Sequence, residues 1–300
     1  MTKISEDYPG KELSIDELKN KLVAETKIVK LAESKFPTEI IDLPSAGKLY
    51  EAGHPLTSGK VEMKYMTAKE EDILTSQNLI QKGVVIDMLL RSLIVSNGEG
   101  SPVNYDDLVI GDKNAIMISA RVLGYGAEYP IEVSCPKCQN KVKEVVDLAS
   151  LDNKEVDLGE NGNNFEFVLP LSKKLISFKI LSHSDEKLIE GEVKRMKKRT
   201  KSTQISYDLT SRLKTIITAI DGEDTKQAVD NFVENEFVSR DSLAFRKHLE
   251  SISPDVDMTI FFECDSCAHE GDVAIPMTVD FFWPRVWIPS YSTQANIWIT

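Results

Sequence analysis

Hydrophobic residues recur at helical spacing near the start of the chain. Residues 14–35 begin with Ser14-Ile15-Asp16-Glu17, a sequence typical of a capping box in which the Ser and Glu side chains bind each other's backbone amides. The apolar positions that follow are near heptad spacing, but Glu25 interrupts them, which argues against a long coiled coil. The pattern predicts one amphipathic helix, packed either on its own domain or on a partner.

The next segment, residues 38–128, is predicted to combine loops, a strand and helices. Val61, Met63 and Tyr65 alternate with polar residues, which is the period of a half-buried strand. Helical patterns predict helices over about 68–79, 83–95 and 112–123. The second of these helices is expected to face the core with Val84, Met88, Leu89 and Leu93.

From residue 129 the pattern changes to alternation, and it does so around two Cys-x-x-Cys pairs. The first pair is preceded by Ile131 and Val133 and followed by Val142, Val145 and Val146; the second is preceded by Met258–Glu263 and followed by Val273–Phe281. Strand, turn and strand are therefore predicted twice.

Between these two copies lies a predicted insert, residues 149–256. Its pattern indicates a hairpin (Phe165–Val168 with Leu175–Ile180) and a helix capped by Ser184. Further helices are predicted over 205–220, 225–235 and 240–250, the first two separated by Asp221-Gly222.

Together these patterns predict an α+β fold with a helix-rich N-terminal unit and a split, zinc-ribbon-like β unit that carries a large inserted α+β domain. The predicted parts are a helical arm (1–37), a loop-strand and helical domain (38–128), the split β unit (129–148 with 257–282), the insert (149–256) and an aromatic tail (283–300). The tail holds all three tryptophans, Trp283, Trp287 and Trp298, and is expected to pack either on its own core or on a neighbouring subunit.

All four cysteines of the chain fall in the two pairs, as Cys135 with Cys138 and Cys264 with Cys267. The first residues lack the apolar region of a secretory signal, so a reducing cytoplasm is expected, and there this arrangement favours a metal over disulfides. Four thiolates are a preferred tetrahedral shell for structural Zn²⁺. We therefore predict a four-cysteine zinc site without catalytic function, because a complete shell leaves no open coordination position.

Two other interpretations of the cysteines remain open, a redox dithiol and four metal-free thiols. Redox Cys-x-x-Cys motifs usually open a helix, whereas Pro136 and the β-prone residues after Cys138 do not predict one. The 125 residues between the pairs exceed the spacing of a short zinc ribbon, but an inserted domain costs little loop entropy. His269 lies two residues beyond Cys267 and is expected to support the shell or lie on the surface rather than bind the metal.

The charge of the chain argues against nucleic acid as a partner. Lys and Arg number 36 against 48 Asp and Glu, for a net charge of −12. One basic run stands out, and it is either a solvated helix face or a contact to an acidic protein: Lys194, Arg195, Lys197, Lys198, Arg199 and Lys201. A membrane span is not expected either, because Asp87 and Arg91 interrupt the most apolar stretch.

Sequence motifs for catalysis are incomplete or missing. The stretch from Gly53 to Lys60 resembles a phosphate loop, but its glycines are one residue too far apart and Val61 replaces the required Ser or Thr. No Gly-x-Ser-x-Gly motif occurs, and the four histidines are scattered. The sequence therefore predicts a protein that is not an enzyme.

Several segments, in their order along the chain, resemble a known family. They are Leu43-Pro44-Ser45-Ala46-Gly47-Lys48-Leu49-Tyr50, Gly59-Lys60-Val61-Glu62, the segment Met66–Leu74, the two Cys-x-x-Cys turns and Phe281-Phe282-Trp283-Pro284. Over roughly residues 38–284 the chain resembles baseplate proteins of contractile-tailed bacteriophages, the T4-type baseplate hub family.

The resemblance implies a structural protein of the virion tail baseplate, made in the host cytoplasm and bound to other hub or wedge proteins or to copies of itself. It supplies no catalytic residues. Two other function classes remain open: an assembly chaperone that is absent from the finished particle, and an enzyme at the tail tip.

Overall fold

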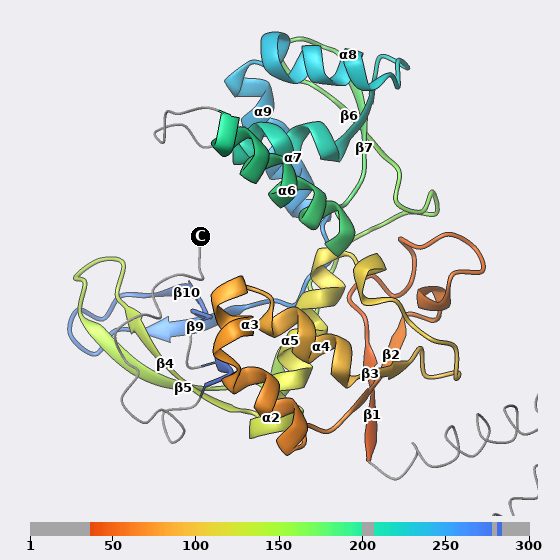
Figure 1. Ribbon diagram of the computed structural model, residues 1–300. Coiled ribbons are helices and arrows are strands. Elements are labelled where there is room, and N and C mark those ends of the chain that lie inside the picture. Colours follow the sequence, from red (N-terminus) through yellow and green to blue (C-terminus); the bar gives the residue numbers. More distant parts are fainter. Residues whose placement is uncertain (1–36, 200–206, 278–280, 284–300) are drawn as a thin grey trace, which may run out of the picture. The chain divides into compact units, whose positions relative to one another are not determined.

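The computed structural model describes residues 37–199, 207–277 and 281–283, which form a mixed α and β structure with small sheets (Figure 1). The predicted helix over 14–35 and residues 284–300 lie outside the described residues. The first sheet contains β1 (Thr38–Asp42), β2 (Lys60–Lys64) and β3 (Ile94–Ser96) in that order. The strand predicted around Val61 and Met63 is confirmed as β2, since both side chains are fully buried.

The helices of this region are α2 (Ala68–Thr75), α3 (Gln77–Lys82), α4 (Val85–Leu93) and α5 (Ile110–Tyr125), with short 3₁₀ turns at Pro55–Ser58 and Tyr105–Asp107. The predicted helix over 68–79 was wrong as a single element, because Ser76 takes an extended conformation and separates α2 from α3.

The buried face of α4 also differs from the prediction. Leu89 and Leu93 are buried as expected, but Val84 and Met88 are 37% and 43% exposed. Val85 and Leu90 take their place in the core. The helix therefore faces the core with a stripe rotated from the predicted one.

Two antiparallel hairpins follow the predicted alternation. One pairs β4 (Glu128–Ser134) with β5 (Lys141–Asp147), and the other pairs β9 (Thr259–Glu263) with β10 (Glu270–Ala274). Val142 and Val146 are buried and Val145 lies on the opposite face, at 65% exposed. One detail was wrong: β10 ends at Ala274 instead of continuing along the predicted run to Phe281. A 3₁₀ turn, Leu148–Ser150, follows β5.

Residues 149–256 form a second sheet region with its own helices. The strands are β6 (Phe165–Val168), β7 (Leu175–Phe178) and β8 (Ile217–Ile220), in that order. The helices are α6 (His183–Arg199), α7 (Asp208–Ile216), α8 (Lys226–Asn231) and α9 (Ser239–Ile252), with a π-helical turn at Phe232–Glu236.

Two predictions in this region were wrong. The helix predicted over 205–220 ends at Ile216, and Ile217–Ile220 pairs with β7 as a strand. The predicted cap Ser184 lies inside α6, whereas the backbone amide and hydroxyl of Ser182 bind the Asp185 carboxylate at 3.0 Å.

Buried apolar side chains form two main clusters. The first draws on residues 43–148 and 256–282 and includes Tyr129, Cys135, Phe262 and Cys264. The second lies within residues 169–245 and centres on Phe178 and Phe245, whose rings meet edge to face. The two hairpins thus pack on the first core, although one of them follows the insert in the sequence.

Candidate metal centre

Each cysteine pair lies in a tight turn that joins the two strands of a hairpin. In the first turn the Gln139 amide donates to the Cys135 carbonyl, and the Cys135 amide donates to the Asn140 carbonyl. In the second turn the Ala268 amide donates to the Cys264 carbonyl, and the Cys264 amide donates to the His269 carbonyl. The two turns therefore have the same backbone hydrogen bonds, position for position.

The same residue of each turn takes a left-handed backbone conformation. Gln139 has a φ of 61° and Ala268 a φ of 49°. L-residues with a Cβ rarely adopt this region, at a cost of about 1 kcal/mol or more. Both turns contain this strained conformation directly after their second cysteine.

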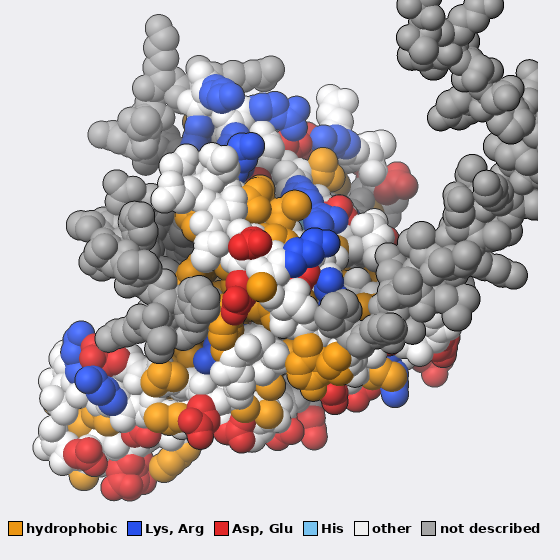
Figure 2. Space-filling model, turned by 60° about the horizontal axis from the view of Figure 1, so that its bottom comes forward, with side chains coloured by type: hydrophobic (Ala, Val, Ile, Leu, Met, Phe, Trp, Pro, Cys, Tyr) orange, Lys and Arg blue, Asp and Glu red, His pale blue; other side chains and the backbone are white. Residues whose placement is uncertain are grey.

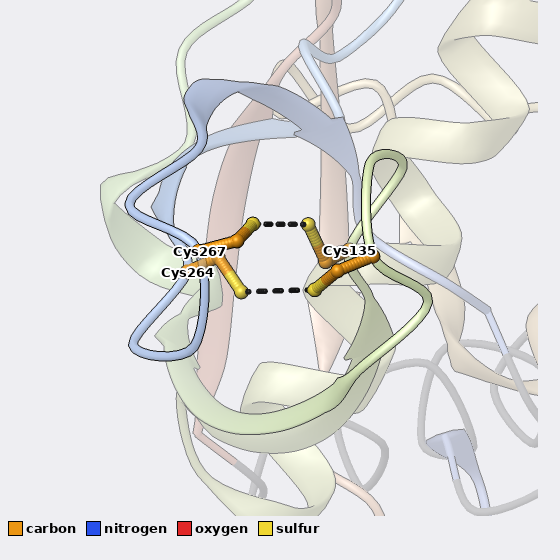
Figure 3. Close-up of side chains that lie close together, drawn as sticks. Cys135, Cys264 and Cys267 are labelled. Atoms are coloured by element: carbon orange, nitrogen blue, oxygen red, sulfur yellow. Dashed lines mark hydrogen bonds between the residues drawn. The ribbon is translucent and has the colours of Figure 1, made fainter.

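The two turns bring the four sulfur atoms together (Figure 3). Cys135 Sγ lies 3.7 Å from Cys267 Sγ, and Cys138 Sγ lies 3.6 Å from Cys264 Sγ. All four sulfur atoms lie within 4.8 Å of one another. The cysteines are free thiols, since these distances far exceed the roughly 2.05 Å of a disulfide bond.

This geometry fits a tetrahedral metal ion. Zn–S bonds of about 2.3 Å in a tetrahedron place neighbouring sulfur atoms about 3.8 Å apart. The two shortest sulfur separations agree with that value to within about 0.2 Å. Cys135 and Cys264 are buried, Cys267 is half-buried and Cys138 is exposed, so the site lies at the edge of the first core.

The pKa values of Cys135 and Cys267 are shifted in opposite directions. Burial raises the pKa of Cys135, but hydrogen bonds from the Cys138 and Lys137 amides and from neighbouring thiols outweigh it and hold this pKa at about 6. Burial and hydrogen bonds with the other thiols raise the pKa of Cys267 to about 12. A cation that binds all four sulfurs must therefore displace protons, and its affinity falls as the solution becomes more acidic.

Neighbouring polar groups connect the two turns. The Asn140 side chain donates to Ser266 Oγ at 2.9 Å, which is a direct contact between the two hairpins. His269 contributes its backbone carbonyl to the second turn and is half-buried. The four groups that converge are the cysteine sulfur atoms.

A buried carboxylate that sequence analysis missed holds the Leu43–Tyr50 segment. Asp112 accepts hydrogen bonds from the Ser45 amide at 2.9 Å, the Ser45 hydroxyl at 2.6 Å and the Tyr50 hydroxyl at 2.6 Å. Burial raises the pKa of Asp112, although these donors act in the opposite direction. In the sequence an Asp in the first turn of a helix is indistinguishable from a simple dipole complement, so nothing pointed to these partners.

A second polar cluster joins α4, α5 and α6. His183, at the start of α6, is 4% exposed and contacts Asp87 Oδ2 through Nε2 at 3.0 Å and Lys113 Nζ through Nδ1 at 3.3 Å. Nearby Asp106 pairs with Arg91 at 2.5 Å and with Lys187 at 2.6 Å. No sequence pattern indicated this cluster, because its members are up to about 100 residues apart.

The basic run lies at the end of α6, where Lys194, Arg195, Lys197 and Lys198 reach the surface. Lys194 pairs with Glu190 one turn earlier, at 3.1 Å. The side chain of Arg199 is not described at the end of this helix, and Lys201 lies outside the described residues. On the face shown in Figure 2, basic, acidic and hydrophobic side chains all reach the surface.

None of the helices in the described part of the chain is both long and apolar enough to cross a membrane.

Comparison with known proteins identifies one family. No curated protein and no solved structure matches the chain. The model of the family described as T4 bacteriophage base plate protein matches residues 37–283, nearly the same range as the resemblance found in the sequence. This match covers most of the chain, and the protein therefore belongs to the T4 bacteriophage base plate protein family.

Proposed function

We propose that the protein is a structural component of a contractile-tail baseplate, in the hub or the region next to it, and that a Zn²⁺ ion bound by four cysteines stabilises its fold. The family match over residues 37–283 is the main support for the role in the baseplate. It supports a structural protein of the virion tail that associates with other baseplate proteins. The convergence of four thiols supports the second part.

In this proposal the metal joins two hairpins that are remote in sequence. Cys135 and Cys138 come from the β4–β5 turn, and Cys264 and Cys267 come from the β9–β10 turn. Each hairpin has only two strands, and isolated two-stranded hairpins are marginally stable at best. A zinc ion held by all four cysteines would tie them together in a zinc-ribbon-like unit and fix both ends of the insert.

The proposed domain boundaries separate the two hairpins from the insert between them. The split unit comprises residues 129–148 and 257–282, the insert comprises 149–256, and residues 38–128 form the domain before them. The two separate apolar clusters support this division, because the second cluster draws only on residues within the insert, apart from the half-buried Ile110 packed against it.

We propose that the protein acts by binding other proteins and not by catalysis. A complete shell of four thiolates has no open position for substrate. The buried polar groups described above, Asp112 and His183, are engaged with Ser45, Tyr50, Asp87 and Lys113 in contacts that join elements of the fold. Its proposed neighbours are other hub or wedge proteins, or further copies of itself around the tail axis.

Metal analysis of the purified protein tests the zinc site. We expect one zinc per chain, and Cys264→Ser should lose the metal and several kcal/mol of stability, because zinc binding contributes on the order of 10 kcal/mol in small domains. The matched control is His269→Ala, beside the second turn, which should keep both metal and stability. A metal-free wild-type protein, or equal metal loss in both variants, would refute the assignment.

An assembly chaperone is the alternative function. It predicts the same zinc site and partners, but a protein that is absent from the finished particle. Quantitative mass spectrometry of purified virions separates the two functions: a structural component is present at fixed stoichiometry to known tail proteins, whereas a chaperone is found only in the lysate.

A further inference from the structure

The chain enters and leaves the insert through two segments that pair with each other. Residues 152–154 and 255–257 lie antiparallel in a short two-stranded link, which we call the hinge. The Lys154 amide donates to the Asp255 carbonyl at 2.8 Å, and the Asp257 amide donates back to the opposite segment, also at 2.8 Å. The insert is therefore attached covalently at one place.

One segment of the hinge lies against the first turn of α5. A Cβ at Gly111 would be only 1.7 Å from the Pro254 carbonyl oxygen, so the two backbones are in direct contact. The Asn114 side chain donates to the Asp255 carboxylate at 3.1 Å. Residues 152–154, the other segment, are exposed. Their backbone angles can change without disturbing packed side chains, which is what a hinge requires.

A second contact joins the insert to the domain before it. The His183 amide donates to the Leu108 carbonyl at 2.8 Å. The Ile110 amide donates to the Leu181 carbonyl at 3.1 Å. His183 and Ile110 are the first residues of α6 and α5, so neither amide has an acceptor within its own helix. Their protection from exchange with solvent depends on this second contact, which we call the domain contact.

Charged side chains surround the domain contact. His183 Nδ1 lies 3.3 Å from Lys113 Nζ, and its Nε2 lies 3.0 Å from Asp87 Oδ2. A lysine ammonium group only donates, so Nδ1 accepts from Lys113 and Nε2 donates to Asp87. Lys113 Nζ also lies 3.8 Å from the Glu186 carboxylate. Lys113 of α5 thus contacts two residues of α6.

The apolar part of the domain contact is small. Its buried members are Leu49, Val109, Leu158 and Ile180. Interfaces between domains that are small and rich in polar contacts commonly permit relative motion. Breaking the domain contact would expose these four side chains but would leave the two larger apolar clusters unchanged, apart from the half-buried Ile110.

We propose that the insert is a hinged domain, and that Lys113, bound to His183 and Glu186, holds it closed on the domain before it. In the closed state the domain contact is formed. In the open state the insert turns about the hinge, and the domain contact is broken while the hinge and both helix starts stay intact. This proposal depends neither on the zinc site nor on the role in the baseplate.

Amide hydrogen exchange of the full chain tests this proposal. In the wild type the amides of Ile110 and His183 should be protected. In Lys113→Met, which keeps an apolar stem and removes the charge, both should exchange at least about tenfold faster. The matched control is Lys174→Met, which removes an ion pair with Glu236 inside the insert and should leave both rates unchanged.

Other amides distinguish turning of the insert from local loss of structure. The amides of Glu186 and of position 113 bond to residues of their own helix starts. Both should keep their protection in Lys113→Met, because opening leaves these first turns intact. The hinge amides of Lys154 and Asp257 should also keep theirs.

Lys187→Ala is a second variant that guards against misfolding, because Lys187 is exposed. It removes the 2.6 Å ion pair between α6 and Asp106, and should accelerate the same two amides by about threefold. Unchanged rates at Ile110 and His183 in both variants, or fast exchange of these amides in the wild type, would overturn the proposal. Loss of protection that includes the helix starts or the hinge would indicate local unfolding and would equally overturn it.

Discussion

At the scale of single residues, the structure contains strained residues in the cysteine turns and buried polar groups that connect distant segments. Ala268 and Gln139 take left-handed conformations directly after the second cysteine of each turn, and the two turns bring four thiols together. Asp112 and His183 are buried polar groups whose partners come from distant segments. Strained turns and buried charges both affect stability, and each leads to a measurable expectation.

Replacing Ala268 by glycine should stabilise the protein. Glycine adopts a φ of 49° without the steric cost that alanine has there, and the Ala268 side chain is exposed, so little packing is lost. We expect a gain of about 0.5–1 kcal/mol in the free energy of unfolding, measured by denaturant titration with zinc present. Ser266→Gly in the same turn has no such strain to relieve, and an equal gain there would contradict this explanation.

Asp106 should make stability depend on pH. Burial raises its pKa, but Arg91 and Lys187 outweigh this and hold the pKa at about 2, below the usual value of about 3.9. The lowered pKa stabilises the fold above pH ~4, and this contribution is lost as pH falls from about 4 to about 2. At neutral pH Asp106→Asn should cost about 1 kcal/mol after allowance for solvent screening.

Denaturation of the wild type and of Asp106→Asn at several pH values checks this expectation. The difference between the two proteins should shrink below pH ~4 and should also shrink in high salt. A difference that stays constant from neutral pH down to about pH 2 would mean that the carboxylate charge contributes nothing.

At the scale of elements, sequence patterns predicted the existence of most helices and strands but not all of their boundaries. Local periodicity was sufficient for β4 and the β6–β7 hairpin, whose buried and exposed positions alternate along their own sequence. It failed at Ile217–Ile220, because the strand is fixed by pairing with β7, about 40 residues earlier, and not by any local signal. The β-branched residues there were the one available hint.

The cysteine cluster could be predicted from sequence because it depends on two local turns with the same spacing. Each Cys-x-x-Cys turn between alternating residues indicates half of a site, and four thiols suggest one metal. The Asp112 and His183 clusters could not be predicted, since each needs the relative placement of segments about 60 to 100 residues apart. Sequence patterns indicate local turns and strands, but they do not show which distant segments meet in the fold.

The basic end of α6 gives a prediction at this scale. Lys194 is already paired within the helix, and the chain as a whole is strongly acidic, so we expect no binding to duplex DNA at physiological salt. Instead, replacing Lys194, Arg195, Lys197 and Lys198 by alanine should weaken association with an acidic baseplate neighbour. An electrophoretic shift with duplex DNA that disappears in this variant would refute the expectation.

At the scale of the whole molecule, two apolar cores should respond differently to loss of the metal. The proposed zinc joins hairpins that pack on the first core, whereas α6 to α9 pack on the second. Chelation should therefore release amide protection in β4, β5, β9 and β10 first, while amides of β7 and α9 keep theirs. Hydrogen exchange with and without a chelator measures this, and uniform loss across both cores would show that the insert does not fold independently of the zinc.

The central claim is that the protein resides in the tail baseplate, and a density map of purified virions tests it most directly. We expect density for residues 37–283 in the baseplate, in contact with hub or neighbouring wedge proteins, with a single strong peak between Cys135, Cys138, Cys264 and Cys267. A complete baseplate map with no density for this chain would contradict that claim and would favour the assembly chaperone instead.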